Sequence, residues 1–297
     1  FYKLTRVSDR CSCVVGCDLC IRDWLHTGHD YLEPPQTSSA AVFLCAPIVH
    51  TVPTRMAMKT GAPMQRIVVL TGAGISQESG LQTFRGDDGL WNHERITDIC
   101  TPEGFARDPM RVDRFYNGLR AGLAEVQPNA AHRALAHLEE CAATGRWDGE
   151  VLIVTQNIDD LHERAGSRDI VHMHGELMRV RCTSCGATPP WHADCLPRTP
   201  CPACHHATLR PDVVWFGEIP YHMDRIEAAL QACDLFVAIG TSGMVYPAAG
   251  FVRQASTHAD TMEFNMQPSI GTNLFDQTVL GPATKTVPRW VRDVTGT

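Results

Sequence analysis

The stretch RIVVLTGAGIS, residues 66–76, decides the fold of this chain. It begins as a short, apolar, β-branched run, which is typical of a buried parallel strand, and it ends at a turn that contains Gly72 and Gly74. Glycines here would let a pyrophosphate approach the backbone, and the following helix N-terminus would offer free N–H groups. A tight strand-to-helix turn without a ligand explains the stretch about as well, because it is not the GxGxxG fingerprint.

Three later stretches repeat the pattern of an apolar strand with a polar tip: VLIVTQN (151–157), DLFVAIGTS (234–242) and, more weakly, TMEFN (261–265). An amphipathic helix is expected over 130–144, after Pro128 and Asn129. Strands that alternate with helices predict an α/β fold, a doubly wound parallel sheet with helices on both faces. Ligands bind such sheets beyond the carboxyl ends of the strands, where these polar tips fall.

The bulk composition sets limits on function. With 44% hydrophobic and 20% charged residues, the chain is of ordinary globular type. A net charge of −7 gives no basic field for nucleic acid, and no apolar run reaches the 18 residues that a membrane helix needs. Paired CxxC units in a large chain indicate metal ligands in a reducing compartment rather than disulfides, so we expect a cytoplasmic protein.

Residues 1–64 differ from the rest because they have no clear helical or strand period. We expect a disordered N-terminal extension, followed by a regularly patterned domain over 65–295. The CSCVVGCDLC run (11–20), with His26 and His29 nearby, contains only one CxxC, so a metal site there is the weaker of two alternatives.

A stronger metal signal lies at CTSC (182–185) and CPAC (201–204), which are separated by fifteen residues. Each CxxC turn brings two thiolates to one tetrahedral ion, and four protein ligands leave no open position for catalysis. The spacing predicts one structural zinc ion in a module at about 177–212. The expected ligands are Cys182, Cys185, Cys201 and Cys204.

Six stretches together resemble the sirtuin family, in its bacterial-type class III branch, over about residues 65–295 and in the family's order. They are TGAGISQESGLQTFRGDDGLW (71–91), QNIDDLHERAG (156–166), HMHGE (172–176), VVWFGE (213–218), GTSGMVYPAA (240–249) and the asparagine of EFN, Asn265.

The resemblance implies a Rossmann-like domain with a smaller zinc-bearing module, and a cleft between them where NAD meets an acyl-lysine. By that resemblance the residues that contact NAD are Gly72, Ala73, Gly74, Phe84, Arg85, Gln156, Asn157, Asp159, Gly240, Thr241, Ser242, Asn265 and Ala283. The segments that clamp a substrate peptide as a β-strand contribute Val214, Phe216, Gly217, Glu218, Val245 and Tyr246.

The family's catalytic base is the histidine immediately before a glycine, which is His174 here. The near-neutral pKa of histidine suits the removal of a proton from a ribose hydroxyl. His172 points to the opposite face if the segment is extended, so we expect a structural role for it.

The acyl pocket is where the chain departs from the family. Class III members that remove succinyl or malonyl groups carry a Tyr-x-x-Arg pair, whose arginine binds the distal carboxylate. Here Tyr116 is followed three residues later by Leu119, and the arginine is Arg120. On a helix Arg120 either still reaches the pocket or faces solvent, and Tyr116 and Arg120 are kept as candidate substrate-binding residues.

The sequence therefore predicts NAD-dependent removal of acyl groups from protein lysines, giving nicotinamide and O-acyl-ADP-ribose. Acetyl is the expected group, with succinyl or malonyl left open, and the protein is expected to be a monomer. Three alternatives remain: an ADP-ribosyltransferase or NAD-cleaving enzyme, a non-catalytic NAD- or acyl-lysine-binding module, and a zinc-ribbon nucleic-acid binder. The peptide-clamping segments, His174 and the scarcity of aromatic residues around the CxxC pairs argue against them in turn.

Overall fold

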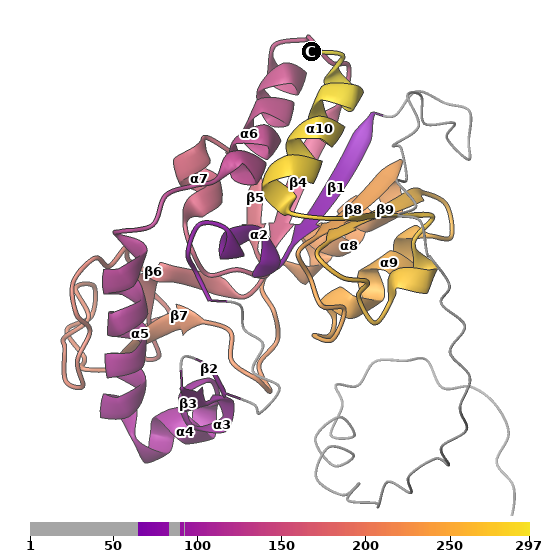
Figure 1. The fold of residues 1–297 in the computed structure, drawn as a ribbon. Helices are drawn as coiled ribbons and strands as arrows, with labels where there is room; N and C mark the ends of the chain where they lie inside the picture. Colours follow the sequence, from indigo (N-terminus) through magenta and orange to yellow (C-terminus); the bar gives the residue numbers. More distant parts are fainter. Residues whose placement is uncertain (1–64, 83–89, 92) are drawn as a thin grey trace, which may run out of the picture. The chain divides into compact units, whose positions relative to one another are not determined.

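The computed structural model describes residues 65–82, 90, 91 and 93–297 (Figure 1). The extension at 1–64, its cysteine run, and Phe84 and Arg85 therefore lie outside the described residues. No helix among the described residues is both long and apolar enough to cross a bilayer.

The centre of the fold is a parallel sheet of six strands in the order β10-β9-β8-β1-β4-β5, which confirms the predicted fold class. Strand β1 lies in the middle of the sheet. The chain next adds β4 and β5 on one side of it, and then crosses back to add β8, β9 and β10 on the other. The order therefore reverses between β1 and β8, and such a reversal opens a crevice at the carboxyl ends of the strands. The strands are β1 (Arg66–Thr71), β4 (Glu150–Thr155), β5 (Ile170–His172), β8 (Leu235–Ile239), β9 (Asp260–Asn265) and β10 (Gln277–Leu280).

Alternate residues of β1 enter two separate cores, because successive side chains in a strand point to opposite faces. Ile67 and Val69 pack into one buried cluster, and Val68 and Leu70 into the other. Figure 1 shows α6 and α10 over one face and α8 and α9 over the other. The helices are α2 (Gly74–Gln77), α6 (Ala130–Ala143), α7 (Leu161–Ala165), α8 (Met223–Ala232), α9 (Phe251–Ala255) and α10 (Ala283–Thr295), with 3₁₀ turns η1 (Ala248–Gly250) and η2 (Thr272–Leu274).

Helix α6 begins where the sequence predicts, because Asn129 caps it. The Asn129 side chain accepts a hydrogen bond from the backbone amide of Ala131 at 2.9 Å, and the His132 ring accepts one from the backbone amide of Asn129 at 3.3 Å. This reciprocal pair satisfies donors that the first turn of a helix leaves without partners.

A smaller region stands apart from the sheet in Figure 1 and has its own buried clusters. Its two-stranded antiparallel ribbon carries the CxxC pairs, and a helical segment packs against the ribbon. The sequence predicted the ribbon's module but not the helical segment. The elements are β2 (Leu90–Trp91), β3 (Glu94–Arg95), α3 (Ile96–Ile99), α4 (Pro102–Arg107), α5 (Pro109–Leu123), β6 (Gly175–Cys182) and β7 (Leu209–Val213).

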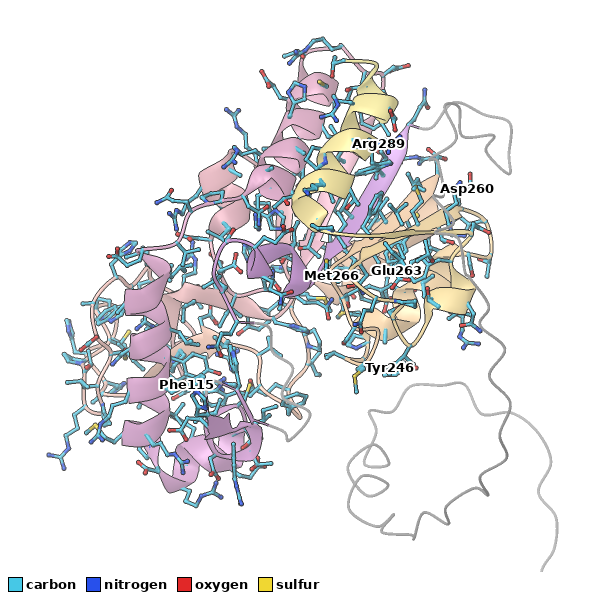
Figure 2. The ribbon with its side chains drawn as sticks, in the orientation of Figure 1. Phe115, Tyr246, Asp260, Glu263, Met266 and Arg289 are labelled. Atoms are coloured by element: carbon cyan, nitrogen blue, oxygen red, sulfur yellow. The ribbon has the colours of Figure 1, made fainter. Side chains whose placement is uncertain are left out.

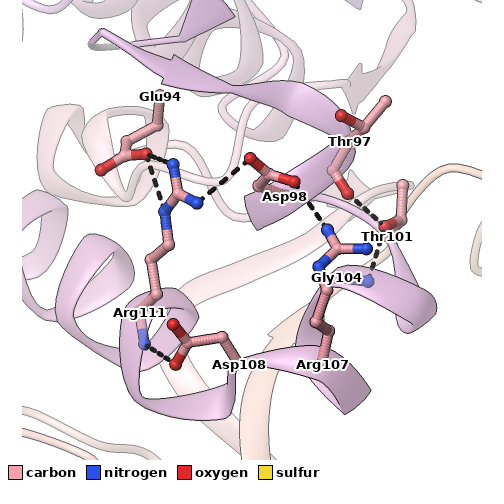
Figure 3. A network of polar contacts seen from close by, with 8 residues as sticks. All are labelled: Glu94, Thr97, Asp98, Thr101, Gly104, Arg107, Asp108 and Arg111. Atoms are coloured by element: carbon pink, nitrogen blue, oxygen red, sulfur yellow. Dashed lines mark hydrogen bonds and ion pairs between the residues drawn. The ribbon is translucent and has the colours of Figure 1, made fainter.

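A network of ion pairs and hydrogen bonds connects the short elements at the edge of this region (Figure 3). The Arg111 guanidinium pairs with Glu94 and, at 3.1 Å, with Asp98, which also accepts from Arg107 at 2.6 Å. Asp108 caps α5 through the amide of Arg111 at 3.0 Å. Because one carboxylate serves two guanidinium groups, β3, α3, α4 and α5 are held together although each is short.

Candidate functional site

One cavity of about 990 Å³ opens at the carboxyl ends of the strands and extends to the smaller region. Its walls include the turn after β1, the segment after β4, the tip of β8 and the end of β9, as expected for the reversal point of a doubly wound sheet. Of the described candidate residues, the cavity wall contains Gly72, Ala73, Gly74, Gln156, Asn157, Asp159, His174, Val214, Phe216, Gly217, Glu218, Gly240, Thr241, Ser242, Val245, Tyr246, Asn265 and Ala283.

The glycine turn after β1 is packed directly against the tip of β8. A Cβ on Gly72 would lie 2.8 Å from the Gly240 oxygen, and one on Gly74 would lie 2.6 Å from the Gly240 Cα. Gly240 itself has φ +63° and would clash with Ile75 if it carried a side chain. The three glycines are therefore required by the contact between two backbones, whatever ligand lies beside them.

The expected row of free amides at the start of α2 is not present. The amide of Gly72 donates to Ile239 at 3.0 Å, and that of Gly74 donates to Gly240 at 2.8 Å. The amides of Ile75 and Ser76 donate back into the same turn, at 3.1 and 3.2 Å. A pyrophosphate here would therefore lie against a compact glycine turn rather than on an open helix end.

A buried polar chain stands behind this turn. The side-chain amide of Asn157 donates to the main-chain oxygen of Gly72 at 3.2 Å and to the Ser76 hydroxyl at 3.3 Å. That hydroxyl donates to the Asp159 carboxylate at 3.0 Å. Burial raises the pKa of Asp159 to about 6, against the lowering effect of hydrogen bonds from Leu161 and Ser76. Ser76 was not predicted as a site residue, although its place in the GAGIS stretch pointed to it.

His174 is held by its Nδ1 atom, which lies 3.0 Å from the main-chain oxygen of Gln156. Since a carbonyl oxygen only accepts, Nδ1 carries the proton and Nε2 is the unprotonated nitrogen of the neutral ring. Burial lowers the pKa of His174, while the bond to Gln156 opposes the shift. The arrangement gives a neutral imidazole in the cavity wall, which is the form a general base requires.

His172 is separated from His174 as the alternation predicted. It is not part of the cavity wall, and its Nε2 contacts the carboxylate of Glu163. Burial acts to lower the pKa of His172, but the hydrogen bond and the charge of Glu163 prevail and raise it.

The segments after β8 and β9 are joined at one end of the cavity. The side-chain amide of Asn265 donates to the main-chain oxygen of Thr241 at 2.7 Å, and the side-chain amide of Gln156 donates to the Thr241 hydroxyl at 3.1 Å. Ser242 accepts from the amide of Met244 at 3.2 Å, and Ala283 begins α10 beside them. These contacts fix the relative positions of three segments that are far apart in sequence.

Two chain segments border the cavity mouth. The amide of Val214 donates to the His174 oxygen at 2.9 Å, and the amide of Phe216 donates to Cys100 at 3.0 Å. Opposite them, Tyr246 is 74% exposed, and Figure 2 labels it with Met266 in the loops that follow β8 and β9. Phe216 and Met266 line the same cavity and are exposed as well, and a group of exposed apolar side chains is typical of a surface that receives a partner.

Glu218 is tied to the protein rather than free in the cavity. Its carboxylate accepts from Arg210 at 2.6 and 3.0 Å and from the amide of Trp215 at 2.8 Å. The same guanidinium lies 3.4 Å from the centre of the Trp215 ring. Burial acts to raise the pKa of Glu218, but the bonds from Arg210 and Trp215 prevail and lower it. Glu218 thus shapes the segment around Phe216 and Gly217.

Tyr116 and Arg120 are not in the cavity wall. The Tyr116 ring is fully buried, accepts from the Trp215 indole at 3.0 Å and donates to Cys100 Sγ at 3.6 Å. Arg120 is 4% exposed, so neither expected position, pocket or solvent, is the observed one. Its guanidinium donates to the Leu177 oxygen at 3.1 Å and to Asn117 at 2.7 Å, and Leu119 lines the cavity in its place.

The four predicted cysteine ligands come together in the ribbon module. Their sulfur atoms all lie within 4.8 Å of one another, with Cys182 and Cys204 at 3.6 Å and Cys185 and Cys201 at 3.8 Å. Zn–S bonds of about 2.3 Å in a tetrahedron place sulfur atoms about 3.8 Å apart, so the donor set fits one zinc ion. The described cysteines form no disulfide.

The family model, the sequence relatives and the solved structures that match this chain all point to the Sir2 family. The sequence profile of the Sir2 family matches residues 72–247. An NAD-dependent protein deacylase of Salmonella typhimurium is 54% identical over 230 residues, which cover 76% of this chain and 82% of that protein.

Two solved structures of Sir2 homologues are also similar. One is a complex with NAD, with a TM-score of 0.71, 38% identity, and 78% of this chain and 90% of that chain covered. The other is a substituted homologue in complex with 2′-O-acetyl-ADP-ribose, with a TM-score of 0.70, 37% identity, and 78% and 93% covered.

Proposed function

The chain belongs to the Sir2 family, and from this premise we propose that it is an NAD-dependent protein-lysine deacylase with His174 as its catalytic base. The observation that carries the proposal is the orientation of His174, whose Nδ1 is held by the Gln156 oxygen so that Nε2 is free to accept a proton.

The cavity residues support NAD as the cofactor. Gly72 and Gly74 present backbone atoms to the cavity, and a pyrophosphate would lie against them. Asn265 and Thr241 would hold the adenosine half, with Ala283 near the adenine. Asn157 and Asp159, together with Ser76, would meet the nicotinamide and ribose half. Phe84 and Arg85 are proposed to cover that half.

When bound, NAD would supply the ribose carbon to which the acyl oxygen becomes joined as nicotinamide leaves. Attack of a ribose hydroxyl on the acyl carbon and the addition of one water molecule would then break the bond to the lysine nitrogen, so that the products are nicotinamide, free lysine and O-acyl-ADP-ribose. His174 accepts the proton of a ribose hydroxyl at Nε2, and the Gln156 oxygen stabilises the protonated ring through Nδ1–H. His174 is half-buried in the cavity wall, and a bound acyl-lysine and NAD would exclude stray water there, which would otherwise hydrolyse NAD.

The peptide of the substrate is proposed to lie at the mouth of the cavity, between the segment Val214–Glu218 and the segment Val245–Tyr246. Main-chain pairing there would read few side chains and so allow many protein substrates. The bond from Val214 to the His174 oxygen links this segment to the base, so a bound peptide would be positioned relative to His174.

Zinc is proposed to be structural. The cysteine cluster supplies four ligands, which leaves no open coordination position, and it lies in its own ribbon module. We also propose, from the sequence alone, that the protein is a cytoplasmic monomer that acts on proteins rather than nucleic acid.

The test is a mass-spectrometric assay of the purified protein with one peptide carrying acetyl-lysine, with and without NAD. NAD-dependent loss of acetyl and formation of O-acetyl-ADP-ribose are expected, and the His174→Ala variant should show neither while it still binds NAD. Nicotinamide release without acyl loss would favour the NAD-cleaving alternative instead.

A further inference from the structure

The part of the cavity next to α5 differs chemically from the rest. Its described wall is formed by apolar side chains that also belong to the buried core of the smaller region. An acyl group that passes His174 would end against this wall, because the dinucleotide half of the cavity lies on the other side, at the strand tips. The apolar side chains are Trp91, Leu119, Leu123, Val126, Leu177 and Val213.

Helix α5 turns a smooth face to the cavity. Gly118, Leu119, Gly122 and Leu123 line it, and at about 100° per residue they occupy one side of the helix. A Cβ added to Gly118 or Gly122 would meet no described atom within 4 Å. The two glycines, one helical turn apart, thus leave a shallow trough along the helix, with Leu119 beside it.

The charges around the cavity disfavour an acidic acyl group. Among the described residues, the wall contains three carboxylates, Glu78, Asp159 and Glu218, but no lysine or arginine. Arg120 lies about 130° around α5 from the middle of the cavity face, where its guanidinium is used by Leu177 and Asn117. A carboxylate at the end of an acyl chain would lose its hydration shell here, and no lysine or arginine of the described wall would compensate for that cost.

We propose that this end of the cavity accepts neutral aliphatic acyl groups longer than acetyl and discriminates against acyl groups that end in a carboxylate, with Leu119 as the specificity-determining residue. The proposal rests on the proposed deacylase function and names its substrate class. The straight chain would lie in the trough left by Gly118 and Gly122 and contact Leu119 and Leu123. Each methylene that is fully buried there should improve kcat/KM by up to about fourfold.

The experiment measures kcat/KM for one peptide carrying acetyl-, butyryl-, hexanoyl- or succinyl-lysine, with saturating NAD. For the wild-type protein we expect hexanoyl to be removed at least as efficiently as acetyl, and succinyl at least about tenfold less efficiently. This comparison requires no variant, so it stands even if a substitution fails to fold.

Two variants and a matched control locate the effect. Leu119→Arg should raise the succinyl-to-hexanoyl ratio by at least about tenfold, because it places a cation on the cavity face. Gly122→Leu should lower the hexanoyl-to-acetyl ratio by at least about fivefold by filling the trough. Ala121→Leu makes a similar change one residue away, at an exposed position outside the wall, and should leave both ratios unchanged.

The proposal is overturned if the wild-type protein prefers succinyl to acetyl, if hexanoyl is removed far less well than acetyl, or if neither Leu119→Arg nor Gly122→Leu changes the ratios. Each of these outcomes leaves the deacylase function intact because acetyl is still removed. Failure to remove any of the four groups, acetyl included, would instead contradict the proposed function and this proposal with it.

Discussion

His174 Nδ1 lies 3.0 Å from the main-chain oxygen of Gln156, which is eighteen residues earlier and directly follows β4. A main-chain acceptor cannot be lost by protonation or by a rotamer change, so this contact sets the tautomer of the ring more firmly than a side-chain partner would. Gln156 also bonds Thr241 through its side chain, and the same residue therefore orients the proposed base and joins two strand tips.

The pH dependence of the reaction should report this histidine. A base must be neutral, and burial lowers the pKa of His174, so the acid limb of kcat/KM should lie below the ordinary histidine value of about 6.5. We expect activity to be flat from about pH 7 upward until another group titrates, and to fall only as the pH drops through the lowered pKa.

Its control is His172→Gln. That histidine is outside the cavity wall and its raised pKa arises from Glu163, so its removal should leave the acid limb in place. If the fall of kcat/KM at acid pH disappeared in His172→Gln, the group that titrates would be His172 and not His174.

The turn between β1 and α2 should be sensitive to a single methyl group. Gly240→Ala forces a residue at φ +63° and brings its Cβ to 2.4 Å from the Ile75 amide, so we expect the free energy of unfolding to fall by about 2–4 kcal/mol. Chemical denaturation measures this loss. Gly145→Ala has a similar φ of +71° with no described atom within 4 Å, and should cost only about 1–2 kcal/mol. Equal losses in the two variants would contradict the close contact.

Much of the sheet could be predicted because its central strands are short apolar runs that end in polar tips. The predicted strands correspond to β1, β4, β8 and β9, and α6 begins directly after Asn129, as the sequence predicts. The sequence missed β5 and β10, which are three and four residues long, because such lengths leave no readable period.

In the candidate site, the sequence predicted the residues at the strand tips but not those on α5. Motif residues such as Asn157 fall in the cavity wall because strand tips in a parallel sheet meet at one edge. The orientation of α5 could not be predicted, because the residues around Gly118 give no clear apolar stripe and Arg120 is a polar side chain that packs inward. Ser76 was missed because the GAGIS stretch gives its place in the turn but not that its hydroxyl lies between Asn157 and Asp159.

Asp159 should make stability depend on pH. Its pKa is raised to about 6 in the folded chain, so the folded state binds its proton more tightly than the unfolded state does. The stability that this proton provides is fully present below the unfolded pKa near 3.9 and is lost as pH rises through about 6. Above that pH the ionised carboxyl costs about 3 kcal/mol relative to its protonated form.

Asp159→Asn should therefore raise the melting temperature at pH 7.5 but much less at pH 5, while it reduces turnover. Thermal unfolding at the two pH values measures the difference. Asp160→Asn changes the same charge at the adjacent, more exposed position and is the matched control. A gain for Asp159→Asn that is the same at both pH values would contradict the assignment.

Removing two thiols from the cysteine cluster should release one metal ion per chain. In Cys182→Ser with Cys185→Ser, two of four ligands are lost, and the ribbon module should unfold because a structural zinc site supplies folding free energy directly. Metal content by elemental analysis and proteolysis of the region around 182–204 measure the two effects. Cys141→Ala removes a buried thiol from α6, far from the cluster in sequence, and should keep the metal. An unchanged metal content in the double variant would exclude the site.

Arg120 should matter for stability and not for the choice of acyl group. Arg120→Met removes the bonds to Leu177 and Asn117 and leaves a buried oxygen without its donor, so we expect a loss of about 2–4 kcal/mol in the free energy of unfolding. Arg120 also acts to lower the pKa of buried Asp113, which burial raises to about 7, so its removal takes away a nearby favourable charge. The ratio of succinyl to acetyl removal should stay as in the wild type, because Arg120 is not in the cavity wall and its guanidinium is bonded to Leu177 and Asn117. A variant that kept full stability but lost a measurable succinyl activity would place Arg120 in the acyl pocket after all.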